Sequence, residues 1–210
     1  INHAYHLNRG QLIDLNGNPR PEIKQYTIHT NPAVYLSDTS ISYVFSRIDN
    51  DTSTLDTLHR VDMTLEAANT GTRIFKTEQI PGVTNYFLPN IPIGIKRNKG
   101  FSRTVINDVY PNIDMQFYSN SEGVKYYFIV RPGGNADDIV MKFDGATAVN
   151  VTSDSSKLEI ITSIGKLDFE AGHAYQINPG NQIVPMPWQA KFVKTANNKA
   201  KLDIRQYPQN

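Results

Sequence analysis

The sequence predicts an all-β protein of antiparallel strands. The chain of 210 residues has 13 glycines and 12 prolines, most of which bound short runs rich in Val, Ile, Tyr, Phe and Thr. We find no long segment with the apolar spacing and caps of a helix. Strand-like runs recur about every 8–12 residues with turns between them, a spacing typical of β-sandwiches and open barrels.

Three hairpins are the clearest predicted elements. The first hairpin joins strands 33–36 and 41–48 through the turn 37–40. The second joins strands 114–118 and 124–130 through the turn 119–123, and the third joins strands 148–152 and 158–162 through the turn 153–157. Further strands are expected at 23–29, 59–67, 73–76, 139–143, 166–169, 174–177, 183–185, 189–193 and 201–204. Pro111 lacks an amide proton, so it should begin or edge the strand 114–118 and not lie inside it.

A faint internal repeat suggests two β-sandwich-like lobes. Residues 42–47 resemble 126–131, and residues 61–68 resemble 139–146. The alternative is that any two alternating strands of Val, Met and Phe look alike. We predict an N-terminal lobe over 1–95 and a C-terminal lobe over 96–210. The seam would be the segment 89–103. Its basic part, 96–103, carries Lys96, Arg97, Lys99 and Arg103; it could attract an anionic polymer, but we favour a solvated linker.

Composition gives no overall support to several classes of function. The formal net charge is +1, so there is no global field that favours nucleic acid, an anionic membrane or acidic substrates. No apolar run approaches the roughly 20 residues that span a bilayer. Cysteine is absent, which excludes disulfides, thiolate nucleophiles and Cys-ligated metals but leaves the compartment open.

Catalytic motifs are missing from the sequence. It contains no G-x-S-x-G, S-x-x-K or H-E-x-x-H pattern and no glycine-rich phosphate loop. The remaining enzyme hypothesis is a pair of carboxylates acting as acid and base, as in glycosidases. The candidates for such a pair are Asp108, Asp114, Asp137, Asp138, Asp168 and Glu170. We predict that the chain has no catalytic residues and no cofactor.

Two segments suggest metal binding weakly. The acidic stretch Asp49–Asp56 looks like a calcium loop, but Thr54 and Arg60 stand where an EF-hand needs Gly and Glu. A looser calcium site in this loop stays open, beside the favoured interpretation of a solvated loop. His3 and His6 lie close in sequence but lack a third ligand. We therefore predict no metal site.

Aromatic side chains are the candidates for ligand binding. Tyr126, Tyr127 and Phe128 are consecutive, so at least one must face away from the core of a sheet. We name Tyr126, Tyr127 and Trp188 as residues that could stack on sugar rings. The alternative is core packing and cross-strand pairing, which aromatic residues also favour.

Several stretches together resemble one known family. They are Asn8–Gln11, Pro21–Lys24, Ile41–Phe45, Leu58–Met63, Asn85–Phe87, Val109–Asp114, Tyr126–Gly133 and Ala174–Gln176. The chain is similar to the β-rich N-terminal domain of unknown function in bacterial surface proteins that carry SBBP repeats or a gliding-motility-associated C-terminal domain. The stretches Ser-Tyr-Val-Phe and His-Arg-Val-Asp-Met resemble the Bacteroidetes branch.

The resemblance implies a location and a role. It implies export through type IX secretion, display at the outer cell surface and a long parent protein, and it supplies no catalytic residues. We therefore expect a non-catalytic module that is structural or adhesive. Its partners would be other domains of the same protein, or an extracellular glycan or protein. The alternative is a carbohydrate-binding module of a secreted polysaccharide-degrading protein.

Overall fold

The computed structural model describes residues 4–48, 57–71, 73–120, 123–178, 180 and 182–204. The prediction of an all-β, antiparallel fold is confirmed. One short 3-10 helix, η1 (Ala136–Asp138), accompanies the strands. The strands are β1 (Tyr5–Leu7), β2 (Ile23–Thr27), β3 (Ala33–Ser37), β4 (Ser40–Arg47), β5 (Thr57–Leu65), β6 (Arg73–Gln79), β7 (Thr84–Tyr86), β8 (Ile95–Asn98), β9 (Gly100–Tyr110), β10 (Ile113–Asn120), β11 (Gly123–Val130), β12 (Val140–Asp144), β13 (Ala148–Val151), β14 (Lys157–Ile161), β15 (Lys166–Glu170), β16 (His173–Ile177), β17 (Ile183–Gln189), β18 (Lys191–Ala196) and β19 (Lys199–Asp203).

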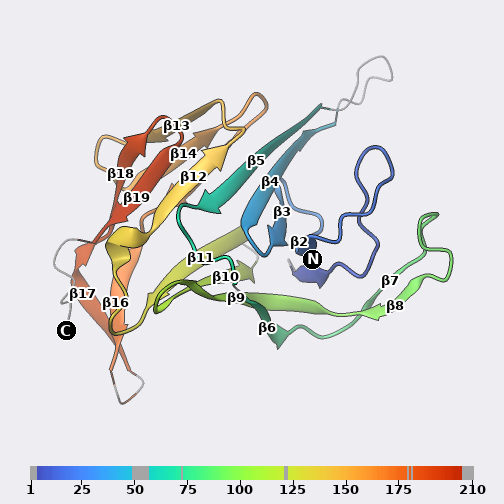
Figure 1. Ribbon diagram of the computed structural model, residues 1–210, viewed down its shortest axis with the longest axis horizontal. Helices are drawn as coiled ribbons and strands as arrows, with labels where there is room; N and C mark the ends of the chain where they lie inside the picture. The colour runs from blue at the N-terminus through green and yellow to red at the C-terminus, as the bar shows by residue number, and fades with distance from the viewer. Residues whose placement is uncertain are drawn as a thin grey trace.

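A 12-stranded sheet dominates the fold. Its strand order is β11-β10-β9-β1-β2-β3-β4-β5-β12-β19-β18, and β6 pairs with β9 beside this path. The small sheets are β13-β14-β15, β16-β17 and β7-β8. Figure 1 shows that the large sheet is strongly curved, with β9–β11 below β4, β5 and β12. The Tyr126 hydroxyl on β11 accordingly lies 3.9 Å from the Met141 sulfur on β12.

The core fills the inside of this curve. Met63 on β5, Met115 and Phe117 on β10, and Phe143 on β12 are all at most 1% exposed. The sheet β13-β14-β15 covers one side of the core through Phe169 on β15. The Phe169 ring contacts the rings of Tyr43, Tyr126 and Phe143 at centroid distances of 5.7, 5.3 and 5.7 Å. Apolar side chains from distant strands therefore share one core cluster.

The three predicted hairpins are confirmed as β3–β4, β10–β11 and β13–β14. The β3–β4 turn is closed by its own serine, because Ser37 Oγ accepts the amides of Thr39 and Ser40 at 3.3 and 2.9 Å. Pro111 lies in the turn between β9 and β10, outside both ladders, which confirms its predicted position. Local turn chemistry and alternation explain these elements.

The prediction of a solvated linker over 96–103 is wrong. The segment contains most of β8 and the start of β9, which has 11 residues. Ile106 on β9 pairs with Met115 on one side and with Ile74 of β6 on the other. The cations led us to expect a linker, but Lys96, Arg97 and Lys99 occupy exposed positions around buried ones.

The division into lobes 1–95 and 96–210 stays a prediction. The large sheet takes strands from both ranges, since β5 pairs with β12 and β1 pairs with β9. The two strands of the proposed repeat face each other, with Met63 opposite Phe143. Their hairpin partners differ, because β4 pairs with β5 whereas β12 has β5 and β19 as neighbours. Strand pairing therefore does not follow the repeat.

Candidate functional site

The Tyr-Pro-Asn-Ile-Asp stretch and the later Arg-Pro-Gly-Gly stretch meet at the β9–β10–β11 corner. Arg131 reaches both Asp108 and Asp114 with the two arms of its guanidinium group. Asp114 is 7% exposed, and its Oδ1 also accepts the Asp108 amide at 2.8 Å. We call Asp108, Asp114 and Arg131 the corner latch. A fork-shaped cation that satisfies two carboxylates fixes the angle between the strands.

The turns on either side complete this corner. The Arg131 amide donates to the Asn112 carbonyl at 2.9 Å, and the Gly134 amide donates to the Arg131 carbonyl at 2.9 Å. A Cβ at Gly134 would lie 3.0 Å from the Asn112 carbonyl oxygen, so the two turns approach as closely as glycine allows. The Tyr110 hydroxyl donates to the Glu66 carbonyl at 2.8 Å. These motif residues hold the fold together.

The carboxylates proposed as acid and base are engaged in other contacts. Asp108 and Asp114 come together, but Arg131 neutralises both. The remaining four are spread over separate contacts: Asp137 with Lys201 at 3.4 Å, Asp138 with the Asn135 amide at 3.1 Å, Asp168 with Lys166 at 3.2 Å, and Glu170 with Lys157 at 3.4 Å. Among these six residues, no two carboxyl groups face each other free of a cation or other partner, as the acid and base of a glycosidase would.

A histidine that the sequence did not single out joins three elements. His59 Nε2 lies 2.8 Å from the Gly145 carbonyl, and His59 Nδ1 lies 2.9 Å from Ser163 Oγ. A carbonyl can only accept, so the proton is on Nε2, and Nδ1 accepts from Ser163. A catalytic triad would place a carboxylate on the far nitrogen. Here His59 ties β5 to the loops after β12 and β14.

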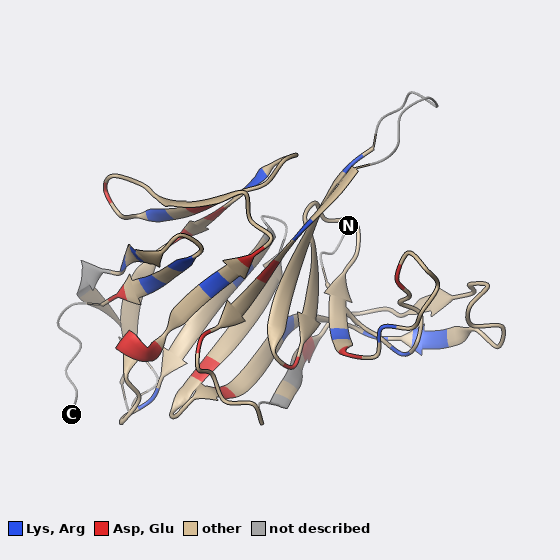
Figure 2. Cartoon of the chain, turned by 45° about the horizontal axis from the view of Figure 1, so that its top comes forward, with Lys and Arg blue, Asp and Glu red and all other residues tan. Residues whose placement is uncertain are grey.

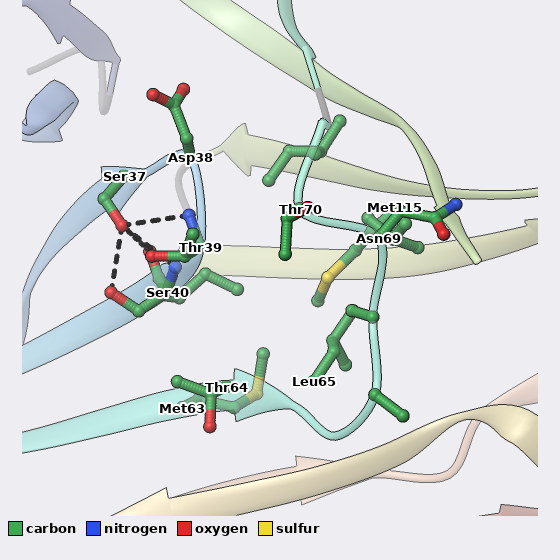
Figure 3. A pocket seen from close by; sticks show the side chains of 15 residues that line it. Ser37, Asp38, Thr39, Ser40, Met63, Thr64, Leu65, Asn69, Thr70 and Met115 are labelled. Carbon is green, nitrogen blue, oxygen red and sulfur yellow. Dashed lines mark hydrogen bonds between the residues drawn. The ribbon is translucent and has the colours of Figure 1, made fainter.

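A pocket opens at the edge of the core between two turns, and it is the main candidate binding site (Figure 3). Its volume is about 300 Å³. The side chains of Met63, Leu65 and Met115 point toward its middle, and the carboxylate of Asp38 points away from it. Its apolar lining comes from Ile41, Met63, Leu65, Ala67, Ala68, Ile106, Val109 and Met115, and its polar rim from Ser37, Asp38, Thr39, Ser40, Thr64, Asn69 and Thr70.

Hydrogen bonds hold both walls of this pocket in place. On the β3–β4 side, Ser37 Oγ lies 2.9 Å from Ser40 Oγ. On the β5–β6 side, Asn69 donates its amide to the Val109 carbonyl at 2.9 Å and its side-chain nitrogen to the Asp108 carbonyl at 2.7 Å. Ala67 adopts φ 54°, a strained angle for a residue with a Cβ. The pocket is therefore preformed, as ligand sites usually are.

The aromatic candidates lie on different surfaces. Tyr126 points into the core, where its ring meets Phe128 and Phe169, and burial raises the pKa of its hydroxyl. Tyr127 points outward from the same strand and is 39% exposed. The side chain of Trp188 lies outside the described residues. The structure thus separates Tyr126 from Tyr127, and the sugar-stacking role of the set stays a prediction.

The metal candidates contribute no site in the part of the chain that the structure describes. The loop Asp49–Asp56 and His3 lie outside the described residues. His6 is 5% exposed, and its Nδ1 lies 3.4 Å from the Tyr86 hydroxyl. Burial, with a smaller effect of the positive charge of His29, lowers the pKa of His6. No cluster of three His, Asp or Glu side chains occurs among the described residues.

The fold and the corner latch define an all-β module in which a curved antiparallel sheet carries a small preformed pocket. The family described as Domain of unknown function (DUF7948) matches residues 5–210, and the chain belongs to this family. No curated protein and no solved structure matches the chain. In the described residues, no helix has the length and apolar character needed to cross a membrane.

Proposed function

We propose that the chain is a non-catalytic binding module at the N-terminal end of a large secreted bacterial cell-surface protein. The resemblance to the Bacteroidetes surface proteins with SBBP repeats or a gliding-motility-associated domain supports the location and type IX export. The use of the motif residues in the corner latch supports the absence of catalysis. The single observation that carries the binding role is the preformed pocket between the β3–β4 and β5–β6 turns.

The chemistry of the pocket favours an uncharged apolar group. Its volume of about 300 Å³ is roughly twice the ~150 Å³ cavity that accepts benzene in an engineered protein. Met63 and Met115 give it an adaptable floor, because thioether side chains adjust easily to different shapes. The hydroxyls of the rim can orient the backbone of a bound segment. An apolar side chain of a partner protein, or of the next domain of the same protein, fits this description.

Methionine methyl NMR tests the pocket directly. The four methionines include Met63 and Met115 in the pocket and Met141 in the core as an internal control. Addition of the separately expressed remainder of the parent protein should shift the two pocket methyls and leave Met141 unchanged. Ala68→Phe should fill the pocket and abolish the shifts, and Ala174→Phe on β16 is the matched control. Binding with unshifted pocket methyls contradicts the assignment.

Two further results bear on the other parts of the proposal. Protease treatment of intact producing cells should remove the module if it is displayed at the outer surface, and full protection would contradict that location. Turnover of a glycan or peptide that is lost in Asp114→Asn or Asp168→Asn, with the fold intact, would contradict the non-catalytic role.

A carbohydrate-binding role is the alternative. The outward-facing Tyr127 on β11, 39% exposed beside Ile129 at 41%, is the observation that favours it. Exposed tyrosine rings stack on the apolar faces of sugars and offer a hydroxyl for hydrogen bonding. A glycan array decides the matter, because binding that is lost in Tyr127→Ala and kept in Ala68→Phe would support this role over the pocket.

A further inference from the structure

The arm formed by β7, β8 and the loop between them carries an uncompensated positive charge. We define the arm as residues 83–99. The longer segment 79–107 contains no Asp or Glu. Arg103 pairs with Glu78 at 3.1 Å, whereas the exposed Lys96, Arg97 and Lys99 form no ion pair with any residue that the structure describes.

A further cation joins this group from the neighbouring loop. Arg9 is exposed, and its Nη1 donates to the Lys96 carbonyl at 3.0 Å. Figure 2 shows that the arm projects away from the sheet and carries blue bands along β8. The net charge of +1 for the whole chain therefore conceals a local concentration of four cations at one projecting end.

The tip of the same arm exposes large apolar side chains. Ile93 is 93% exposed, Phe87 69% and Leu88 39%, and Val83 at the base of the arm, just before β7, is 45% exposed. Most exposed apolar residues occur singly, so four on one short projection are unusual for a surface in contact with water alone. Their exposure points to a partner that removes them from water.

This tip is ordered by its own hydrogen bonds. The Ile91 amide donates to the Leu88 carbonyl at 2.9 Å, and the Gly94 amide donates to the Ile91 carbonyl at 2.7 Å. The Phe87 ring packs against Gly94, where a Cβ would lie 2.8 Å from the ring at φ +73°. The base is fixed where the Asn85 side chain accepts the Arg97 amide at 2.8 Å. Apolar tip and cations thus keep a fixed relative position.

We propose that the arm docks onto an anionic lipid surface, with its apolar tip in the acyl boundary and its cations on the headgroup phosphates. A convex tip of apolar side chains with cations behind it matches the layering of a lipid interface. An acidic protein partner would need a cavity shaped to bury the apolar tip. An acidic protein without such a cavity would bind the arm through its cations alone and would leave the tip in water. The lipid site is separate from the pocket, so this inference goes beyond the proposed function.

Vesicle co-sedimentation of the purified chain tests the proposal. Vesicles of phosphatidylcholine with phosphatidylglycerol should bind the protein, and pure phosphatidylcholine vesicles should bind it much more weakly. Binding should weaken as salt rises. Lys96→Gln and Arg97→Gln should each weaken it about fivefold, and Ile93→Ser about tenfold or more. Soluble glycerol phosphate should not displace the protein, which separates a lipid surface from free phosphate.

A matched control is available on another hairpin. Ile183 on β16–β17 is 67% exposed, so Ile183→Ser removes an exposed isoleucine side chain away from the arm. It should leave vesicle binding unchanged, and all variants should keep the wild-type unfolding midpoint. Equal binding to both vesicle types, or equal loss in Ile93→Ser and Ile183→Ser, would overturn the proposal. Binding to an acidic polypeptide that is unaffected by Ile93→Ser would also overturn it, in favour of a charge-driven protein contact. None of these outcomes affects the pocket.

Discussion

Removal of the Asp114 carboxylate should destabilise the protein strongly, because this group closes the corner latch. Asp114→Ala deletes a charge-assisted hydrogen bond to Arg131, with a typical value of about 1.5–3 kcal/mol. It also leaves the Asp108 amide without its acceptor, at about 1–3 kcal/mol. The Arg131 side chain is 38% exposed, so water recovers part of the loss. We expect a net cost of about 3 kcal/mol.

Urea denaturation monitored by circular dichroism measures this cost. In a chain of this length, about 3 kcal/mol corresponds to a fall of about 6–12 °C in the melting temperature. Glu170→Ala removes a surface ion pair with Lys157, and it should cost less than about 0.5 kcal/mol. A double-mutant cycle with Arg131→Ala should show a coupling of about 1–3 kcal/mol. If Asp114→Ala costs no more than Glu170→Ala, the latch does not hold the corner.

Three further predictions concern single positions. Gly145→Ala should cost about 3 kcal/mol or more, because its Cβ would lie 2.5 Å from a backbone oxygen at φ +88°, whereas Gly82→Ala at φ +92° meets nothing within 4 Å and should cost about 1 kcal/mol in the same urea assay. Tyr126→Ala should cost about 3–5 kcal/mol and Tyr127→Ala less than about 1 kcal/mol, and equal losses would contradict their assignment to inner and outer faces. Burial lowers the pKa of His6, so the unfolded state takes up its proton first as pH falls. The wild-type midpoint should therefore fall as pH drops from about 7.5 through 6.5 toward 5.5, and His6→Gln should reduce that dependence; an unchanged pH profile in the variant would contradict it.

The hairpins were predictable from the sequence because they depend on neighbouring residues. The turn 37–40 closes through the Ser37 hydroxyl, and Pro111 excludes itself from a ladder by its missing amide proton. Burial in β5 and β12 follows the alternation of their side chains, and Met63 and Phe143 lie on the buried face. Such signals need no knowledge of the tertiary fold.

The linker prediction failed because a run of exposed cations can belong to a paired strand as well as to a solvated linker. The strand β9 includes polar and charged residues, and Thr104 is completely buried among them. Its hydroxyl donates to the Gln25 side chain at 2.6 Å, a contact across 79 residues. The His59 contact with Ser163 spans 104 residues. No pattern of neighbouring residues predicts these contacts between distant segments, because they form only when the sheet has folded.

The two proposed binding surfaces also depend on long-range assembly. The pocket joins turns that are separated in sequence, and its floor comes from Met115 on a third strand. The stretches that carry the resemblance, in contrast, include Tyr110, Asp114 and Arg131, whose contacts build the β9–β11 corner. A motif of this kind transmits a fold and leaves the ligand unspecified, because function depends on the site that is built on the fold. In this chain the corner latch serves the fold, whereas the pocket lining and the arm tip are the surfaces that we propose for binding.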